Sequence, residues 1–361
     1  MNAPSPLPYT TPGLPGCGGR IKATPEDFRV EEIPLYPLSG HGEHLYLEIE
    51  KRGIPTATVI QELARALGVP LRGIGHAGLK DAQALATQWL SLHCRADPDL
   101  QRIPGGPWRV LQATRHGNKL RRGHLAGNRF RIAIRGMDPG APAAEILERL
   151  RRRGFPNYFG PQRFGQRGDN GARGKSLLRG TESPAGGPER RKFLTNAYQA
   201  ELFNRILAQR IARDADPGSI LGGDLAVLHR NGASFPVDEA GLKEARRRAE
   251  AHEISASAPL FGYRVPLAAG LPGRWETALL EGESLALADF RRDAKRGSVK
   301  GERRSVRALA DDLTWERDAP HPDNGSGATL LLEFTLPPGV YATSLLREVT
   351  KSQEPASPAT R

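Results

Sequence analysis

The hydrophobic period of the chain changes between residues 47 and 67, and this change limits the possible folds more than any other feature. Apolar and acidic residues alternate from Leu47 to Glu50, which is typical of a half-buried β-strand. From Thr56, a candidate N-cap, apolar residues instead recur at helical spacing as far as Leu67, and Gly68 provides a stop. The chain is therefore expected to combine strands with amphipathic helices.

Further elements along the chain follow the same two periods. Strands are predicted at 89–94, 129–135 and 328–335, helices at 200–211 and around 344–346, and a hairpin at the Asn-Gly pair of 228–233. The Gly-rich, basic stretch 157–191 is expected to be a long functional loop, and 281–327 shows no clear period. A chain of 361 residues is expected to form two domains, or one core with a large insertion.

The charge of the chain favours a polyanionic partner. Lys and Arg number 52 against 40 acidic residues, for a net charge of +12. Cationic side chains that neutralise phosphates release condensed counterions, and this release favours binding to nucleic acid. The strongest basic run, 115–135, holds seven Lys or Arg and no acid, and its end is predicted to be a strand with one cationic face along which phosphates could track. The alternative is a solvated surface without a partner. Nucleic acid is the preferred interpretation.

Several other classes of protein are disfavoured. Only Cys17 and Cys94 occur, without C-x-x-C spacing, and the His residues show no metalloprotease spacing, so no metal is expected. A P-loop is missing as well, and no cofactor is expected. No run approaches the roughly 18 apolar residues of a membrane span, and the N-terminus lacks a signal-peptide pattern. We therefore expect a cytoplasmic protein without a membrane partner.

The most interesting single residue is Asp81, which ends a Gly-rich turn directly after Lys80. A nearby cation keeps a partly buried carboxylate ionised, and an ionised carboxylate can act as a base or a nucleophile. From spacing alone, the preferred interpretation is that Asp81 is an N-cap for the residues that follow. Phe28, Phe130 and Phe334 are likewise first expected to be core residues, because aromatic rings in strands are usually buried, although such rings can also stack on a flipped base.

Six sequence blocks remove much of this ambiguity. The block GHAGLKD at 75–81, followed by Gln88 and Trp89, resembles the signature of the TruD family of RNA pseudouridine synthases. The other blocks, in family order, are ATPEDFRVEE at 23–32, GNRF at 127–130, NYFGPQRFG at 157–165, NAYQAELFN at 196–204 and LPPGVYATS at 336–344. One departure is Ala82-Gln83, where relatives often carry basic residues after the aspartate. It places one local cation in doubt, but not the carboxylate.

The resemblance implies a fold and a domain order. It implies an α+β fold with a pseudouridine-synthase-type mixed α/β catalytic core, split in sequence, and a second, inserted α/β domain specific to TruD. The expected boundaries are a flexible lead-in at 1–19, a catalytic domain at 20–156 and 310–350, an inserted TRUD domain at 157–309, and a flexible tail at 351–361.

The resemblance also implies an activity and a set of site residues. Asp81 matches the catalytic aspartate, and the positions that match the uridine pocket are Phe28, Asn128 and Phe334, with Phe130 and Lys22 as neighbours. The implied reaction isomerises a specific uridine of tRNA, uridine 13, to pseudouridine after base flipping. The sequence leaves open whether Asp81 attacks the sugar, attacks the base or acts as a general base. A non-catalytic RNA-binding protein and a carboxylate-dependent nucleosidase are the alternatives.

Overall fold

The computed structural model describes residues 6–94, 96–165, 167–181, 187–291, 299–318 and 328–352. Its contacts divide the chain into two compact units. The first, here called the sheet unit, is Cys17–Ala141 with Ala310–Val340, and the second, the helical unit, is Met1–Gly16, Pro142–Leu309 and Tyr341–Arg361. Residues 142–156 and 341–350 thus group with the helical unit, and the predicted domain boundaries stay a prediction.

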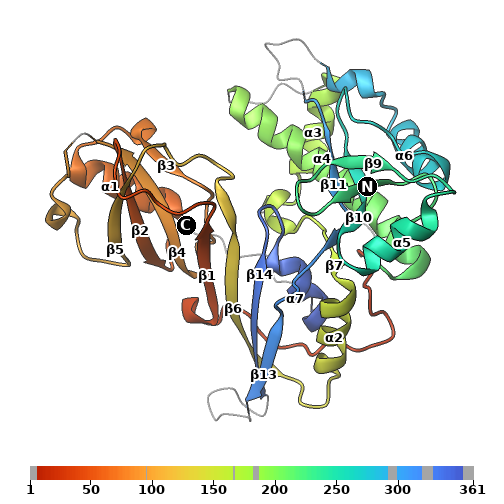
Figure 1. Cartoon of the computed structure of the whole chain (residues 1–361), viewed down its shortest axis with the longest axis horizontal. Coiled ribbons are helices and arrows are strands. Elements are labelled where there is room, and N and C mark those ends of the chain that lie inside the picture. Colours follow the sequence, from red (N-terminus) through yellow and green to blue (C-terminus); the bar gives the residue numbers. More distant parts are fainter. Residues whose placement is uncertain are drawn as a thin grey trace. The chain divides into compact units, whose positions relative to one another are not determined.

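The sheet unit is built on one sheet, in which the described strands follow the order β13-β14-β6-β1-β4-β2-β5, with β3 paired to β4 (Figure 1). The strands are β1 Phe28–Pro34, β2 His44–Arg52, β3 Ile74–His76, β4 Leu85–His93, β5 Trp108–His116, β6 Leu125–Met137, β13 Thr314–Asp318 and β14 Ala328–Leu336. β1 and β4 pair in parallel, whereas β14 pairs with β6 in antiparallel register from far along the chain. The strands predicted at 89–94, 129–135 and 328–335 are confirmed.

One helix covers part of this sheet. Helix α1, Thr56–Leu67, packs Val59 and Leu63 against Leu47 and Leu90 of β2 and β4. The predicted helix and its stop are confirmed, because Gly68 closes α1 in the left-handed conformation at φ 66°. The predicted N-cap is wrong: Pro55 occupies that position, and the Thr56 side chain makes no capping hydrogen bond.

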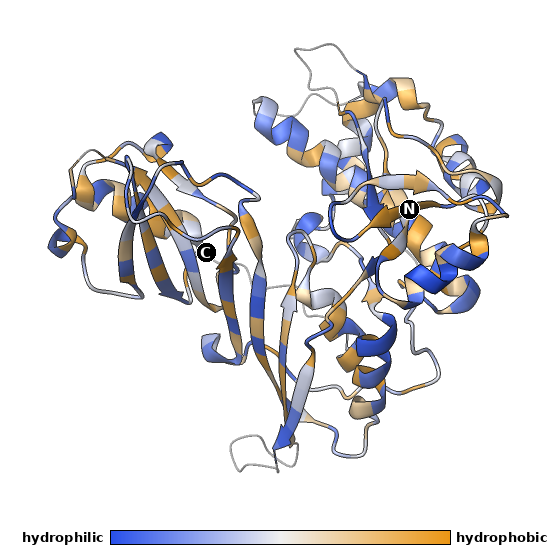
Figure 2. Cartoon of the chain, viewed as in Figure 1, coloured by the Kyte–Doolittle hydropathy of each residue, from blue (hydrophilic) through white to orange (hydrophobic). Residues whose placement is uncertain are grey.

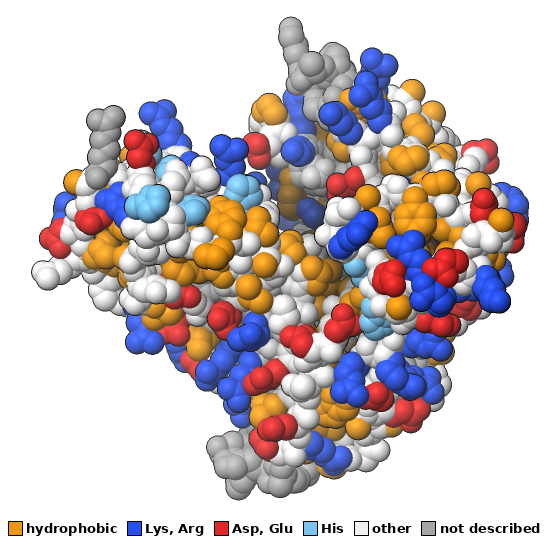
Figure 3. Space-filling view, in the orientation of Figure 1, with side chains coloured by type: hydrophobic (Ala, Val, Ile, Leu, Met, Phe, Trp, Pro, Cys, Tyr) orange, Lys and Arg blue, Asp and Glu red, His pale blue; other side chains and the backbone are white. Residues whose placement is uncertain are grey.

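Strand β6 shows how charge is distributed over the sheet. Hydrophobic and hydrophilic residues alternate along it (Figure 2). Its outward cations are not free, because Arg129 lies 3.8 Å from Glu31 and Arg131 lies 2.9 Å from Glu333 on the two neighbouring strands. The outward face of β6 thus carries the predicted cations, each beside an acidic residue, and the tracking of phosphates along it stays a prediction. Figure 3 likewise shows Lys and Arg intermixed with Asp and Glu over the visible surface.

The helical unit contains a sheet of order β11-β10-β8-β9, a β12-β7 pair, and most of the helices. Its strands are β7 Phe155–Pro156, β8 Leu225–Leu228, β9 Ser234–Pro236, β10 Ile254–Leu260, β11 Glu302–Ser305 and β12 Arg307–Ala308. Its helices are α2 Ala143–Arg153, α3 Asn170–Arg179, α4 Pro188–Asp214, α5 Leu242–Glu250, α6 Gly270–Gly282 and α7 Ala342–Thr350. The hairpin predicted at 228–233 is confirmed by the pairing of β8 with β9.

The loop predicted at 157–191 is wrong, since α3 and the first turn of α4 lie in it. Two of the glycines in this stretch, Gly171 and Gly174, are instead contact residues between helices α3 and α4. A Cβ atom on Gly174 would lie 2.2 Å from the carbonyl oxygen of Leu194 in α4, and one on Gly171 would meet the carboxylate of Glu201. Glycine normally disfavours a helix, but here it allows two helices to approach closely.

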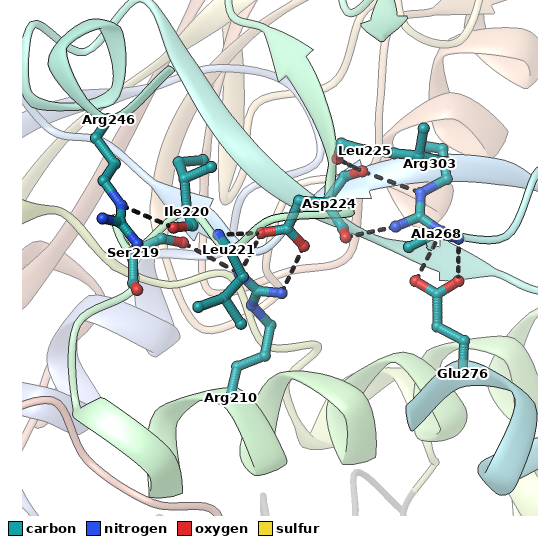
Figure 4. Close-up of polar contacts among 11 residues, drawn as sticks. Arg210, Ser219, Ile220, Leu221, Asp224, Leu225, Arg246, Ala268, Glu276 and Arg303 are labelled. Carbon is teal, nitrogen blue, oxygen red and sulfur yellow. Dashed lines mark hydrogen bonds and ion pairs between the residues drawn. The ribbon is translucent and has the colours of Figure 1, made fainter. Parts of the chain in front are cut away.

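Two buried ion pairs stabilise the interior of the helical unit (Figure 4). Arg210 donates to both carboxylate oxygens of Asp224, at 2.7 and 2.9 Å, and Arg303 donates to Glu276 at 2.9 Å. The Asp224 side chain is fully buried and also accepts the backbone N–H of Leu221. Buried arginines of this unit can therefore obtain a carboxylate partner from a neighbouring element.

The start of the chain has defined contacts within the helical unit. Both the backbone N–H and the hydroxyl of Thr10 donate to Glu348 of α7 at 2.9 Å, and Lys351 donates to the carbonyl oxygens of Thr11 and Leu14. The Pro- and Gly-rich composition of the lead-in does not indicate these contacts. Of the predicted flexible tail, residues 353–361 lie outside the described residues. No helix within the described ranges is both long and apolar enough to cross a membrane.

Candidate active site

The turn that carries Asp81 lies between β3 and β4 of the sheet unit and is held at three points. The backbone N–H of Lys80 donates to the hydroxyl of Thr56 at 3.0 Å, and the ammonium of Lys51 donates to the carbonyl oxygen of Asp81 at 2.5 Å. The N–H of Gln83 donates to the Asp81 carboxylate at 2.9 Å. Such fixed contacts pre-organise the carboxylate, so that little reorganisation is needed when it reacts.

The Asp81 carboxylate is paired with a lysine that is distant in sequence. Lys22 Nζ lies 2.5 Å from Asp81 Oδ2, and the two side chains are 13% and 18% exposed. The Lys22 backbone adopts φ 57°, a left-handed conformation that is uncommon for a residue with a side chain. An adjacent cation favours the ionised form of a carboxylate. Lys22 is thus placed to keep Asp81 charged and, at 4.5 Å from the ring centroid of Phe28, to contact an aromatic ring as well.

The three phenylalanines singled out in the sequence lie next to one another on β1, β6 and β14. The rings of Phe130 and Phe334 stack at 5.3 Å, and Phe28 meets Phe130 edge-on at 6.1 Å. All three side chains are buried, with exposed fractions of 8% or less. Lys22 therefore contacts both Asp81 and Phe28, and Phe28 continues into an aromatic row with Phe130 and Phe334.

Asn128 reaches the same turn through a buried ion pair. Lys80 Nζ lies 2.5 Å from Glu32 Oε2 and donates to Asn128 Oδ1 at 2.7 Å. Burial raises the pKa of the Glu32 carboxyl group, and the charge of Lys80 opposes this shift. Because an ammonium group can only donate, the amide oxygen of Asn128 must face Lys80. Its NH2 group donates to no residue in the described part of the chain, and so remains available as a donor.

Sequence reasoning missed the residues that support the site. Lys51, Thr56 and Glu32 are buried polar residues whose neighbours in the chain give no sign of their partners. Thr56 was assigned to the helix terminus, whereas its hydroxyl accepts from Lys80 and donates to Gln88 at 2.7 Å. The one signal in the sequence was the position of Lys51, a charged residue that directly follows the alternating pattern of residues 47–50.

Because Lys51 is buried, we expect the free energy of unfolding of the protein to depend on pH. Its ammonium group is fully buried and donates to the carbonyl oxygens of Ile54 and Asp81, and burial lowers its pKa from 10.5 to about 8. Between those two pH values the unfolded chain holds a proton that the folded chain has released, so the contribution of Lys51 to stability rises with pH. We expect the free energy of unfolding of wild type, minus that of Lys51→Met, to be constant below about pH 8 and to increase toward pH 10.5.

Urea denaturation of both proteins across this pH range measures the difference. The matched control is Lys243→Met, which removes an exposed lysine of α5. A wild-type-minus-Lys51→Met difference that stays flat from pH 8 to 10.5 would contradict the expected titration.

Within the described ranges, no group of three or more His, Cys, Asp or Glu is arranged to hold a metal ion. Both cysteines are free thiols. The contacts around the Asp81 turn supply an ion-paired carboxylate, an amide donor and a row of aromatic rings.

Comparison with known proteins identifies the family. The family model for tRNA pseudouridine synthase D (TruD) matches residues 7–185 and 188–349. A tRNA pseudouridine synthase D of Anaeromyxobacter dehalogenans strain 2CP-1 is 46% identical over 352 residues, covering 96% of this chain and 97% of that one. A protein of the same name from Thermus thermophilus is 43% identical, covering 96% of this chain and 93% of that one.

A solved structure extends the likeness to the fold. The putative tRNA pseudouridine synthase D of Methanosarcina mazei superposes with a TM-score of 0.77 at 25% identity, and the match covers 96% of each chain. The α+β fold expected from the sequence is thereby confirmed. Since the family model and these relatives match along almost the whole length, the chain belongs to the TruD family, tRNA pseudouridine synthase D.

Proposed function

We propose that this protein converts uridine 13 of tRNA to pseudouridine in the cytoplasm, with Asp81 as the reacting carboxylate. Membership of the TruD family makes the chain a tRNA pseudouridine synthase, which is an isomerase. The observation that carries the assignment of Asp81 is its ion pair with Lys22 at 2.5 Å, beside Phe28 and at the end of a turn held by Thr56 and Lys51. We further infer that the catalytic domain is the discontinuous one, 20–156 with 310–350, and that 157–309 is its insertion.

The proposed roles follow from the contacts of each residue. A uridine within folded RNA must leave its stack before a side chain can reach its glycosidic bond, and aromatic rings commonly receive such a flipped base. Phe28 and Phe334, at the two ends of the aromatic row whose middle ring is Phe130, are proposed to line the uracil pocket. Asn128, whose amide oxygen is held by Lys80, would offer its NH2 group to a uracil carbonyl oxygen.

The reaction breaks the bond between N1 of uracil and C1′ of ribose, turns the base, and joins C5 to C1′. C5 loses a proton and N1 gains one, so the nucleotide keeps the same atoms. Asp81 could form a bond to the sugar, form a bond to the base or remove a proton from the ribose. Each of these roles needs an ionised carboxylate, and the ion pair with Lys22 supplies that condition in every case.

Position-resolved mapping of pseudouridine in a transcribed tRNA tests the proposal. We expect conversion at position 13 and none in a matched transcript that carries cytidine there. Conversion only at other positions would contradict the choice of uridine 13, and the absence of any conversion would contradict the activity. Release of free uracil in the same assay would instead favour a nucleosidase, which would need a second carboxyl group as an acid; Glu32 is already bound to Lys80 and to the N–H of Trp89.

A further inference from the structure

We propose that Arg163 and Arg304 form a phosphate-binding site in the helical unit, and that it takes a phosphodiester group of the RNA. Arg163 ends the short 3-10 helix Pro161–Arg163, and Arg304 lies on β11. Both guanidinium groups lie over the ring of Phe159, with Cζ 5.2 and 4.2 Å from the ring centroid. The identification of the ligand as RNA rests on the proposed function, whereas the site itself rests on these contacts.

Arg304 is held rigidly in this arrangement. Its Nη2 donates to the side-chain oxygen of Asn157 at 2.6 Å, and the amide of Asn157 in turn donates to the carbonyl oxygen of Ser305 at 2.9 Å. The ring beneath it is fixed as well, because Phe159 is 5% exposed and packs edge-on against Phe203 at 5.5 Å. Burial lowers the pKa of Arg304 to about 10, and the charge of Arg163 acts in the same direction.

Arg163 is the unusual member of the pair. The Nε atoms of both arginines are buried without a hydrogen-bonding partner, but Arg304 binds Asn157 through Nη2, whereas the Arg163 side chain forms no hydrogen bond or ion pair among the residues that the structure describes. A half-buried cation beside a second cation is unfavourable unless an anion joins them. We therefore expect Arg163 to bind an anion that is not a side chain of the helical unit.

Several other arginines of the helical unit are either paired with a carboxylate or exposed to water. Arg210 and Arg303 are buried, and each binds a carboxylate, Asp224 and Glu276 respectively (Figure 4). Arg264 and Arg291 also share one ring, that of Tyr263, but both are exposed to water. The combination of burial, a neighbouring cation and a missing acceptor thus distinguishes Arg163 from these arginines.

Phosphate is the ligand that fits this arrangement best. A guanidinium group presents N–H donors in a planar fork that matches two phosphate oxygens, and an aromatic ring orients that plane without using the donors. A phosphodiester carries one negative charge, which two fixed guanidinium groups could share. The same chemistry would bind free inorganic phosphate, so the two sources must be separated by experiment.

The test is tRNA binding by full-length Arg163→Gln at several salt concentrations. We expect the dissociation constant to rise about tenfold, and the slope of log affinity against log salt to fall by about one, because one fewer phosphate is neutralised. The matched control is Arg248→Gln: Arg248 also lies over a ring, that of Phe235 at 5.6 Å, but it is paired with Glu253 at 3.0 Å. The control variant should keep both the wild-type affinity and the wild-type slope.

The variant Arg163→Lys tests whether the effect of Arg163→Gln comes from the lost charge or from a folding defect. Because it retains the charge, it should keep the wild-type salt slope. Unchanged affinity and slope in Arg163→Gln would overturn the proposal. Binding of inorganic phosphate that is lost in Arg163→Gln, without any change in tRNA affinity, would overturn the assignment to RNA. Because binding is measured apart from turnover, a protein that binds tRNA through Arg163 but forms no pseudouridine would contradict the proposed function and leave this site standing.

Discussion

Asp81→Asn is expected to lower the rate of pseudouridine formation by about 10³-fold or more while tRNA affinity stays unchanged. The substitution keeps the size of the side chain and one oxygen that can accept the N–H of Gln83, so the turn should persist. It removes the negative charge that pairs with Lys22, and with it the ability to act as base or nucleophile. Single-turnover pseudouridine mapping on a tRNA transcript measures the rate, and a filter-binding titration measures the affinity.

Asp138→Asn is the matched control for this experiment. Asp138 also lies in the sheet unit and accepts the N–H of the residue two positions on, Gly140, at 2.9 Å, but it is exposed. Its variant should modify tRNA at the wild-type rate. Full modification by Asp81→Asn would exclude Asp81 as the reacting carboxylate, whereas equal losses in both variants would indicate a general sensitivity to charge.

Asp224→Ala is expected to destabilise the helical unit by about 3–5 kcal/mol. Asp224 is fully buried and supplies both oxygens to Arg210, which is 8% exposed, so the variant leaves a buried guanidinium without its counter-charge. The N–H of Leu221 also loses its acceptor. Urea unfolding followed by circular dichroism measures the effect, because most of the helices belong to this unit.

Two further variants separate the cause from a simple loss of packing. The double variant Arg210→Met with Asp224→Leu removes both charges, and should recover most of the lost stability, because paired charges can be replaced by apolar groups of similar volume. Glu244→Ala breaks an exposed pair with Arg247 and should leave the unfolding midpoint unchanged. If Asp224→Ala unfolds at the wild-type urea concentration, the buried pair makes no important contribution to stability.

Most of the long helices and strands of this protein follow from local sequence patterns. Helix α1 and strands β2, β4, β6 and β14 were predictable, because a hydrophobic period depends only on residues within a few positions of one another. Short strands such as β11 and β12, with four and two residues, carry too few positions to show a period, so the stretch 281–327 stayed without assignment. Asp81 was selected by the ordered blocks around it, since its turn alone allowed a capping role.

The contacts between distant residues, in contrast, depend on how the elements pack. Pairing of β14 with β6 places Phe334 on Phe130, although some two hundred residues separate them, and Lys22 reaches Asp81 across 59 positions. Helices α3 and α4 form where glycines suggested a loop, because Gly171 and Gly174 lie in the close contact between them. Such contacts depend on the shape and charge of surfaces that assemble only when the chain folds. The sequence could therefore indicate the carboxylate and Lys22 beside it, but not Lys51 and Thr56, which hold the turn in place.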